Sequence, residues 1–303
     1  MNNSSEVNWD MNTWKEINDA VVAEVFKVRT AQKVFPTMVL DNNPTSISDE
    51  VIDFADLSIK EGQTKQFVEI YVQFAMTATQ VSKEPQLKTC KTLARMAAKG
   101  LALADETVIL QGQRGKLPAN ILADLIESAH DGLLGEADPP DADDNDPNKV
   151  SEPIVVNPPD KPKPGLLFGE RVFEAVAQGI AKLTAKAQAP NFALFLPVRV
   201  YADAFVTPSD ASLVTTADRI KPLVEGGFVN AVTLPQNRGL MTALGGNPIM
   251  LYVGREATIE YVRKEGSKYF FRVVERVQFV ARDPRALVLL KFEPKGAAAK
   301  GRP

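Results

Sequence analysis

The chain has 303 residues, of which 45% are hydrophobic and 24% charged, so it is long enough to bury one large core or two modest ones. Its formal net charge of −3 excludes a strongly basic nucleic-acid groove, and we expect no sequence-specific nucleic-acid binding. One cysteine, Cys90, excludes a disulfide framework within the chain, and no apolar run approaches the ~20 residues of a membrane helix.

The N-terminal stretch lacks a basic segment followed by an apolar one, so no signal peptide is predicted and we expect a soluble protein made in a cytosol. Residues 10–34 are predicted to form an amphipathic helix, capped by Asn12 or Thr13 and ended by Pro36. Such a helix usually packs on its own domain. The alternative is a docking surface for a partner, a cargo or an arm, formed by Trp14, Ile17, Val21, Val25 and Phe26.

Residues 51–77 are predicted to form a long two-stranded ribbon. The first strand covers 51–60, a turn at 61–64 uses the conformational freedom of Gly62, and a return strand alternates cleanly over 66–77. An isolated ribbon is marginal in water, so its apolar face needs cover from its own chain or from neighbouring copies. We expect neighbouring copies to cover it, through Ile52, Phe54, Leu57, Ile59, Phe67, Val68, Ile70, Val72 and Phe74.

Two helices are predicted next, over 85–111 and 118–130. The first is long, with apolar residues at helical spacing, and Gly100 within it indicates a close packing contact. Residues 136–164 then change character, because they are dense in proline and aspartate. A flexible acidic insertion is the expected state, and an extended arm lying on a neighbour is the alternative. The segment lacks the ligand spacing of an EF-hand calcium loop.

From Gly165 the pattern predicts a compact α/β portion. Helices are expected over 173–187 and 216–224, with a short one over 201–205. Strands are expected over 192–200, 228–234, 248–254, 258–262, 269–281 and near 283–292. The last residues, 293–303, form a small Ala/Gly-rich tail.

Catalytic motifs are missing from the sequence. His130 is the only histidine, there is no nucleophile elbow or Walker A sequence, and no Cys/His pair is spaced to hold zinc. We therefore expect no catalytic residue, no cofactor and no metal site, and the chain is predicted not to be an enzyme. An unrelated cytosolic α+β enzyme stays as an alternative, because a site built from carboxylates alone would leave no motif.

Three stretches resemble a known family. Trp14-Lys-Glu-Ile-Asn-Asp19, running on to Phe26, resembles the helix that opens bacterial encapsulins. Asp105-Glu106 with the apolar residues and Gly112 that follow is similar to the end of their spine helix. Residues 277–292 are similar to their C-terminal signature.

Encapsulins share the fold of tailed-phage major capsid proteins, so the resemblance implies an α+β chain with the Hong Kong 97-type phage capsid fold. It implies an N-terminal helix and arm (1–50), an extended-loop hairpin (51–80) and a peripheral domain with the spine helix (81–135). After the insertion (136–164) come the axial domain with the remaining peripheral strands (165–292) and the tail (293–303).

The implied function is a structural subunit that assembles with many copies of itself, as pentamers and hexamers, into an icosahedral shell. Two departures favour a tailed-phage capsid around a genome, in a virion assembled in the bacterial host cytoplasm. Residues 35–44 replace the family's Gly-Pro motif, and compact encapsulins have no counterpart of 136–164. The alternative is an encapsulin nanocompartment that encloses a cargo enzyme in the bacterial cytoplasm.

Overall fold

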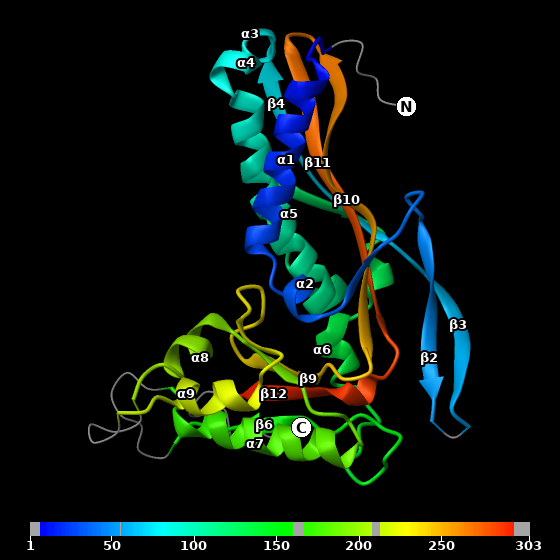
Figure 1. Cartoon of the computed structure of the whole chain (residues 1–303), viewed down its shortest axis with the longest axis vertical. Helices are drawn as coiled ribbons and strands as arrows, with labels where there is room; N and C mark the ends of the chain where they lie inside the picture. Colours follow the sequence, from blue (N-terminus) through cyan, green and yellow to red (C-terminus); the bar gives the residue numbers. More distant parts are fainter. Residues whose placement is uncertain (1–6, 55, 160–166, 208–212, 294–303) are drawn as a thin grey trace, which may run out of the picture.

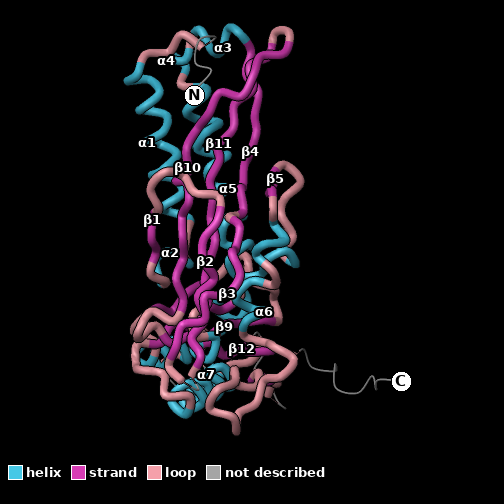
Figure 2. The backbone as a smooth tube through the Cα atoms, turned by 90° about the vertical axis from the view of Figure 1, so that its right-hand side faces the viewer, coloured by secondary structure: helices cyan, strands magenta, loops and turns pink. Residues whose placement is uncertain are grey.

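A five-stranded sheet runs along most of the molecule in the computed structural model, which describes residues 7–54, 56–159, 167–207 and 213–293 (Figures 1 and 2). Its strands lie in the order β1-β10-β11-β4-β5. β10 and β11 form a long antiparallel pair that turns at Gly266, where φ is +57°. The bounds are β1 Thr37–Val39, β4 Val68–Thr77, β5 Ile121–Asp124, β10 Ile249–Glu265 and β11 Lys268–Ala281. The stretches 248–254 and 258–262, predicted as two strands, are therefore one.

Two helices cover one face of this sheet: α1, Met11–Val28, and α5, Thr89–Gln111 (Figure 1). Several alanines of α5 are buried in the core that the helix shares with α1 and the strands. Gly100 extends this contact as predicted, because a Cβ there would lie 3.3 Å from Ile121 Cδ1. Three short helices lie near the ends of α1 and α5: α2 Ala31–Val34, α3 Ala78–Ser82 and α4 Glu84–Leu87.

The N-terminal helix differs from the prediction at both ends. Its cap is Asp10, whose carboxylate accepts a hydrogen bond from the Thr13 backbone N–H at 2.7 Å, and neither Asn12 nor Thr13 takes this role. The helix ends at Val28, because Arg29 adopts an extended ψ of 137° before α2 begins. The predicted single helix over 10–34 is therefore two helices with a bend at Arg29 and Thr30.

A second five-stranded sheet forms the base of the molecule, in the order β6-β12-β9-β7-β8. α7, Glu170–Ala185, lies along it, with α8 Val198–Asp203 and α9 Thr216–Ile220 at one end (Figure 1). β7 ends at Leu196 because Pro197 caps α8, and β9 lies where no strand was predicted. The bounds are β6 Ile154–Val156, β7 Phe192–Leu196, β8 Gly227–Asn230, β9 Arg238–Ala243 and β12 Leu287–Phe292.

A shared apolar cluster joins the two sheets. It combines Leu110 at the end of α5 with Phe195, Leu240 and Phe279 from strands of both sheets. The ring of Phe35, just after α2, stacks on that of Phe195 with centroids 5.5 Å apart. The remaining short elements are α6 Gly132–Glu136 and the 3-10 helices Gly112–Arg114, Ile126–Ala129, Lys221–Leu223 and Pro284–Ala286.

The predicted ribbon over 51–77 is wrong in both strands and in its turn, because the predicted first strand, 51–60, spans the end of β2, the turn and the start of β3. The hairpin is β2, Ser46–Asp53, paired with β3, Ser58–Gln66, and Leu57, just before β3, has a φ of 57° (Figure 1). Gly62 lies inside β3. β4 pairs with β11 and β5 in the long sheet instead. Only Phe67 separates β3 from β4, so the alternating pattern runs through two strands that belong to different sheets.

Two other predictions are corrected. Residues 118–130 do not form a helix, because β5 pairs with β4 and Leu125 leaves the strand at a φ of 59°. The described part of the acidic stretch, 136–159, is not a free insertion. It packs on the base of its own chain, where β6 pairs with β12 in parallel. The tail predicted from residue 293 lies outside the described residues beyond Glu293.

Candidate assembly surface

The hairpin β2–β3 projects beside the long sheet (Figures 1 and 2). Some of its apolar side chains are exposed. Leu57 at its turn is 82% exposed, and Ile59 is 60% exposed. Ile52 faces Ile59 across the hairpin, so the two side chains lie on the same face. Ile52 and Phe54 are half-buried. A second copy of the chain would gain free energy by covering this face.

The root of the hairpin is held firmly. Phe67 donates its backbone N–H to the Thr45 carbonyl at 2.9 Å. Lys65 is buried, pairs with Asp49 at 3.2 Å and lies 4.9 Å from the centroid of the Phe279 ring. These contacts connect the first and last residues of the hairpin to the end of β11, so the projecting part is fixed where it leaves the sheet.

A corner between β11 and β12 contacts the hairpin near its turn. The Ile52 backbone N–H donates to the Arg282 carbonyl at 3.0 Å, and Arg282 pairs with Glu50 at 2.9 Å. The guanidinium of Arg285 lies over the Phe54 ring, with Cζ 3.1 Å from the centroid. These contacts were not predicted from the sequence, although the corner lies in the stretch 277–292 that carried the family resemblance.

The second half of the predicted interface is not available to a neighbour. Phe67, Val68, Ile70 and Val72 are all at most 4% exposed in the single chain. Phe74 is half-buried, and its ring stacks on Phe271 at 5.8 Å. The reason is that β4 is an inner strand of the long sheet, with α5 covering its apolar face. The predicted interface therefore reduces to Ile52, Phe54, Leu57 and Ile59, whose contact with another copy stays a prediction.

The predicted docking stripe on α1 is also mostly used internally. Ile17, Val21 and Val25 are at most 2% exposed, in the same core as α5 and the long sheet. The Trp14 ring packs between Trp9 and Phe271, with centroids 5.0 and 6.3 Å away. Phe26 is 71% exposed, with the Lys33 ammonium 5.6 Å from its ring centroid. Docking on this helix is therefore proposed only for the surface around Phe26.

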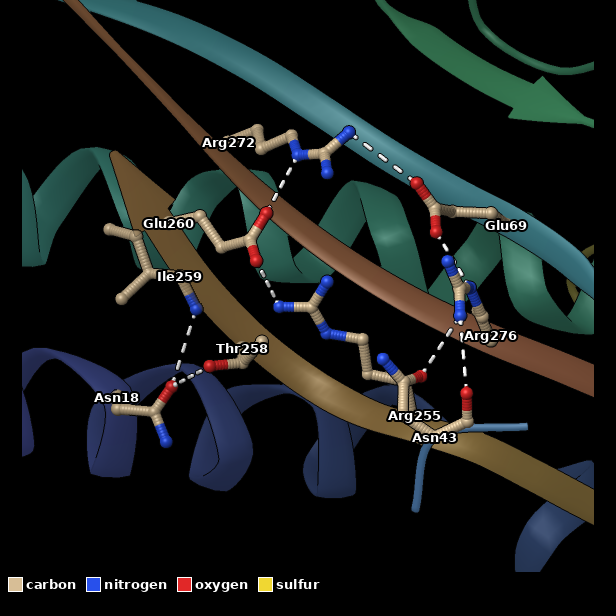
Figure 3. A network of polar contacts seen from close by, with 9 residues as sticks. All are labelled: Asn18, Asn43, Glu69, Arg255, Thr258, Ile259, Glu260, Arg272 and Arg276. Atoms are coloured by element: carbon tan, nitrogen blue, oxygen red, sulfur yellow. Dashed lines mark hydrogen bonds and ion pairs between the residues drawn. The ribbon is translucent and has the colours of Figure 1, made fainter. Parts of the chain in front are cut away.

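The face of the long sheet turned away from α5 carries a row of alternating charges (Figure 3). Glu260 pairs with Arg255 and, at 2.9 Å, with Arg272. Glu69 pairs with Arg272 at 3.4 Å and with Arg276 at 2.7 Å. These side chains come from β10, β11 and β4, so the row connects three strands on a polar, partly exposed surface.

The histidine and the cysteine of the chain lie in different surroundings. His130 lies at the surface, and burial raises the pKa of the Cys90 thiol, which leaves it protonated and unreactive. Within the described ranges, no three His, Cys, Asp or Glu side chains lie close enough to hold a metal ion. Among the same residues, none of the helices has the length and apolar character to cross a bilayer.

Comparisons with known proteins agree with this architecture. Residues 162–278 match the family model described as encapsulating protein for peroxidase. A virus-like particle from Pyrococcus furiosus is similar in structure, with a TM-score of 0.66, 14% identity and coverage of 92% of this chain and 99% of that one. No curated protein sequence matches the chain.

Two further solved structures are similar. The capsid of a native GTA particle has a TM-score of 0.57 and 16% identity, over 86% of this chain and 89% of that one. A structure of Mycobacterium phage Bobi has a TM-score of 0.54 and 11% identity, over 90% and 91%. The long sheet with its spine helix, the base sheet and the projecting hairpin thus form the Hong Kong 97-type fold of encapsulins and tailed-phage capsid proteins, as the sequence resemblance predicted.

Proposed function

We propose that the chain is a structural shell subunit, without enzymatic activity, that assembles with many copies of itself into a closed icosahedral shell. The main support is the projecting hairpin, because its Leu57 and Ile59 side chains are exposed in the single chain and fit a repeated contact with another copy. The fold comparisons add support, since the similar structures include a virus-like particle and a capsid that match most of this chain.

Repeated weak contacts explain how such a shell forms and closes. Each hairpin presents a modest apolar area, which at roughly 25 cal/mol per Å² gives a few kcal/mol when covered. Every subunit makes several such contacts at once, and linked contacts reinforce each other strongly. Contacts of this strength also let misplaced subunits dissociate. Closure into pentamers and hexamers fits heterologous contacts that repeat around an axis.

Two contents fit this shell, and each has its own support. A phage genome is the first, in a virion assembled in the bacterial host cytoplasm. The genome is supported by the segment 136–159, which compact encapsulins lack. It is also supported by the similar phage and GTA structures. A cargo enzyme in a bacterial nanocompartment is the second, supported by the match to the model of a peroxidase-encapsulating family.

Electron microscopy of the full-length chain, expressed alone, tests the shell. We expect closed particles of uniform diameter, and a sample that contains only monomers and dimers at high concentration would refute the proposal. Purification from the natural source then separates the two contents. Long nuclease-protected DNA inside the particles indicates a genome, whereas a co-purifying protein at fixed stoichiometry indicates a cargo enzyme.

A further inference from the structure

The acidic, proline-rich segment is built around a buried lysine of its own chain. Lys186, at the C-terminal end of α7, is 2% exposed. Its ammonium donates hydrogen bonds to the backbone carbonyls of Asp143 at 2.7 Å, of Asp144 at 3.2 Å and of Asp146. A buried ammonium is stable only when its donors are satisfied, so these carbonyls fix the loop 143–146 on the end of α7.

The same loop holds the guanidinium of Arg285. Arg285 donates to the Pro147 carbonyl at 2.9 Å and forms two bonds of 2.9 Å with the Asp283 carboxylate. Asp283 in turn accepts a hydrogen bond of 2.7 Å from Gln188, which follows α7. Contacts on several edges fix the plane of a guanidinium group, and Arg285 is only 12% exposed.

The fixed guanidinium plane supports the hairpin. Its face covers the Phe54 ring, with Cζ 3.1 Å from the centroid. Phe54 follows β2 directly at the turn of the hairpin. A continuous series of contacts therefore runs from α7 through Lys186 and the loop 143–147 to Arg285, and from Arg285 to the projecting end of the hairpin.

We propose that residues 143–147 form a brace that sets the direction of the hairpin β2–β3, with Lys186 and Arg285 as positioning residues. This inference rests on the proposed function, because the direction matters when the hairpin meets a second copy. A hairpin held in one direction loses less conformational freedom on docking, so contacts form at lower subunit concentration. The composition of the segment suits this use, since its turns present backbone carbonyls to the lysine.

The alternative is that the segment only stabilises the end of α7. That role predicts a lower melting temperature in Lys186 variants and no change in the hairpin. The brace and this alternative are distinguished by measuring the direction of the hairpin. The measurement is the distance between two spin labels, one at Leu57→Cys and one at Met96→Cys. Both positions are exposed, at 82% and 67%, and Cys90 is buried. Labelled chains are mixed with a large excess of unlabelled chains, so only distances within one chain are measured.

The variants follow the contacts of the brace. We expect a narrow distance distribution in the parent chain and a clearly broader one in Lys186→Met, Arg285→Met and Phe54→Leu. Phe54→Tyr keeps the ring and restores the narrow distribution. Arg219→Met is the matched control: Arg219 pairs with Glu170 and lies over Phe173 in the same base, away from the brace, so its removal leaves the distribution unchanged.

An unchanged distribution in Arg285→Met and Phe54→Leu would overturn the brace. These two variants decide the matter if Lys186→Met does not fold. The spin-label distance does not depend on assembly. A chain that forms no shells but shows the broader distance distribution in the variants refutes the proposed function and supports the brace. Where shells form, Arg285→Met is expected to need a several-fold higher subunit concentration.

Discussion

Asp105 on α5 and Glu275 on β11 share a single cation, the guanidinium of Arg29. Arg29 Nε lies 2.9 Å from Asp105 Oδ2, and Nη2 donates to Glu275 Oε2. Both carboxylates are completely buried, and one oxygen of each has no hydrogen-bond partner. Glu106 contributes a further negative charge nearby, while it caps α2 through the backbone N–H of Ala31 at 3.0 Å. The bend between α1 and α2 is thus fixed on the spine helix by a buried cluster with more acids than bases.

Burial raises the pKa of both shared carboxyl groups. The pKa of Glu275 rises to about 8 and that of Asp105 to about 6, because one arginine offsets only part of the cost of removing two charges from water. Glu256 adds to the shift of Glu275 through charge repulsion. The folded chain therefore binds protons that the unfolded chain releases.

The first prediction is that stability falls as pH rises through the neutral range. A carboxyl group whose folded pKa exceeds its unfolded value contributes most stability at low pH, so the loss runs from about pH 4.5 to pH 8 for Glu275. Glu275→Gln is expected to reduce this pH dependence by roughly 1–3 kcal/mol. Urea unfolding at several pH values measures the free energy of unfolding as a function of pH. Glu265→Gln, which changes an exposed carboxylate, is the control. If the free energy of unfolding depended on pH equally in both variants, Glu275 would not be the group that causes the loss.

The second prediction concerns the hairpin tip. Leu57→Asp and Ile59→Asp place a charge on the apolar face that a second copy is proposed to cover, so closed shells should not form. The subunit itself should stay folded, because exposed positions usually change stability by less than about 0.5 kcal/mol. Electron microscopy measures the shells and circular dichroism the fold. Leu87→Asp, at an apolar position on α4 that is 56% exposed, is the control and should still assemble.

The spine helix and β11 were predictable because their patterns are long. α5 repeats apolar residues at helical spacing over 23 residues, and the packing contact at Gly100 follows from its place in that helix. A short apolar pattern does not predict secondary structure as well, as residues 118–130 show. Ile121, Leu122 and Leu125 fit a helical face equally well, and only the free edge of β4 selects a strand. That edge is set by the tertiary fold, which a short pattern does not encode.

The hairpin shows a different limit. Gly62 is a strong turn signal by composition, yet the chain turns before β3, where Leu57 adopts the left-handed conformation without a glycine. The acidic segment misleads in the same way. Its composition is typical of disorder, but a buried lysine that lies 40 residues after Asp146 organises it. Such long-range partners leave no local pattern. The pairing of β4 in the long sheet is another, and it removes five of the nine residues predicted for the assembly surface.

The third prediction separates the two sides of α1. Val21 is completely buried, so Val21→Ala should lower the free energy of unfolding by roughly 1–3 kcal/mol. Phe26 is 71% exposed, and Phe26→Ala should change it by less than about 0.5 kcal/mol. Urea unfolding of both variants measures the difference. If α1 serves as a docking surface, Phe26→Ala should weaken partner retention in purified shells; a large loss of stability in Phe26→Ala would instead contradict the described position of the helix.

The last prediction tests the close backbone contact that ends the spine helix. Gly112 and Gly132 both have positive φ, at 59° and 66°, and a Cβ on Gly132 would lie 2.5 Å from the Gly112 nitrogen. Gly132→Ala therefore combines a strained conformation with a collision against backbone, which cannot move aside as a side chain can. We expect a loss of more than about 3 kcal/mol, or failure to fold. Gly246→Ala is the matched control, since Gly246 has a φ of 79° and no atom within 4 Å of its added Cβ. It isolates the conformational cost, about 1 kcal/mol. Equal losses in the two variants, measured by urea unfolding, would show that the backbone at Gly112 and Gly132 is farther apart than described.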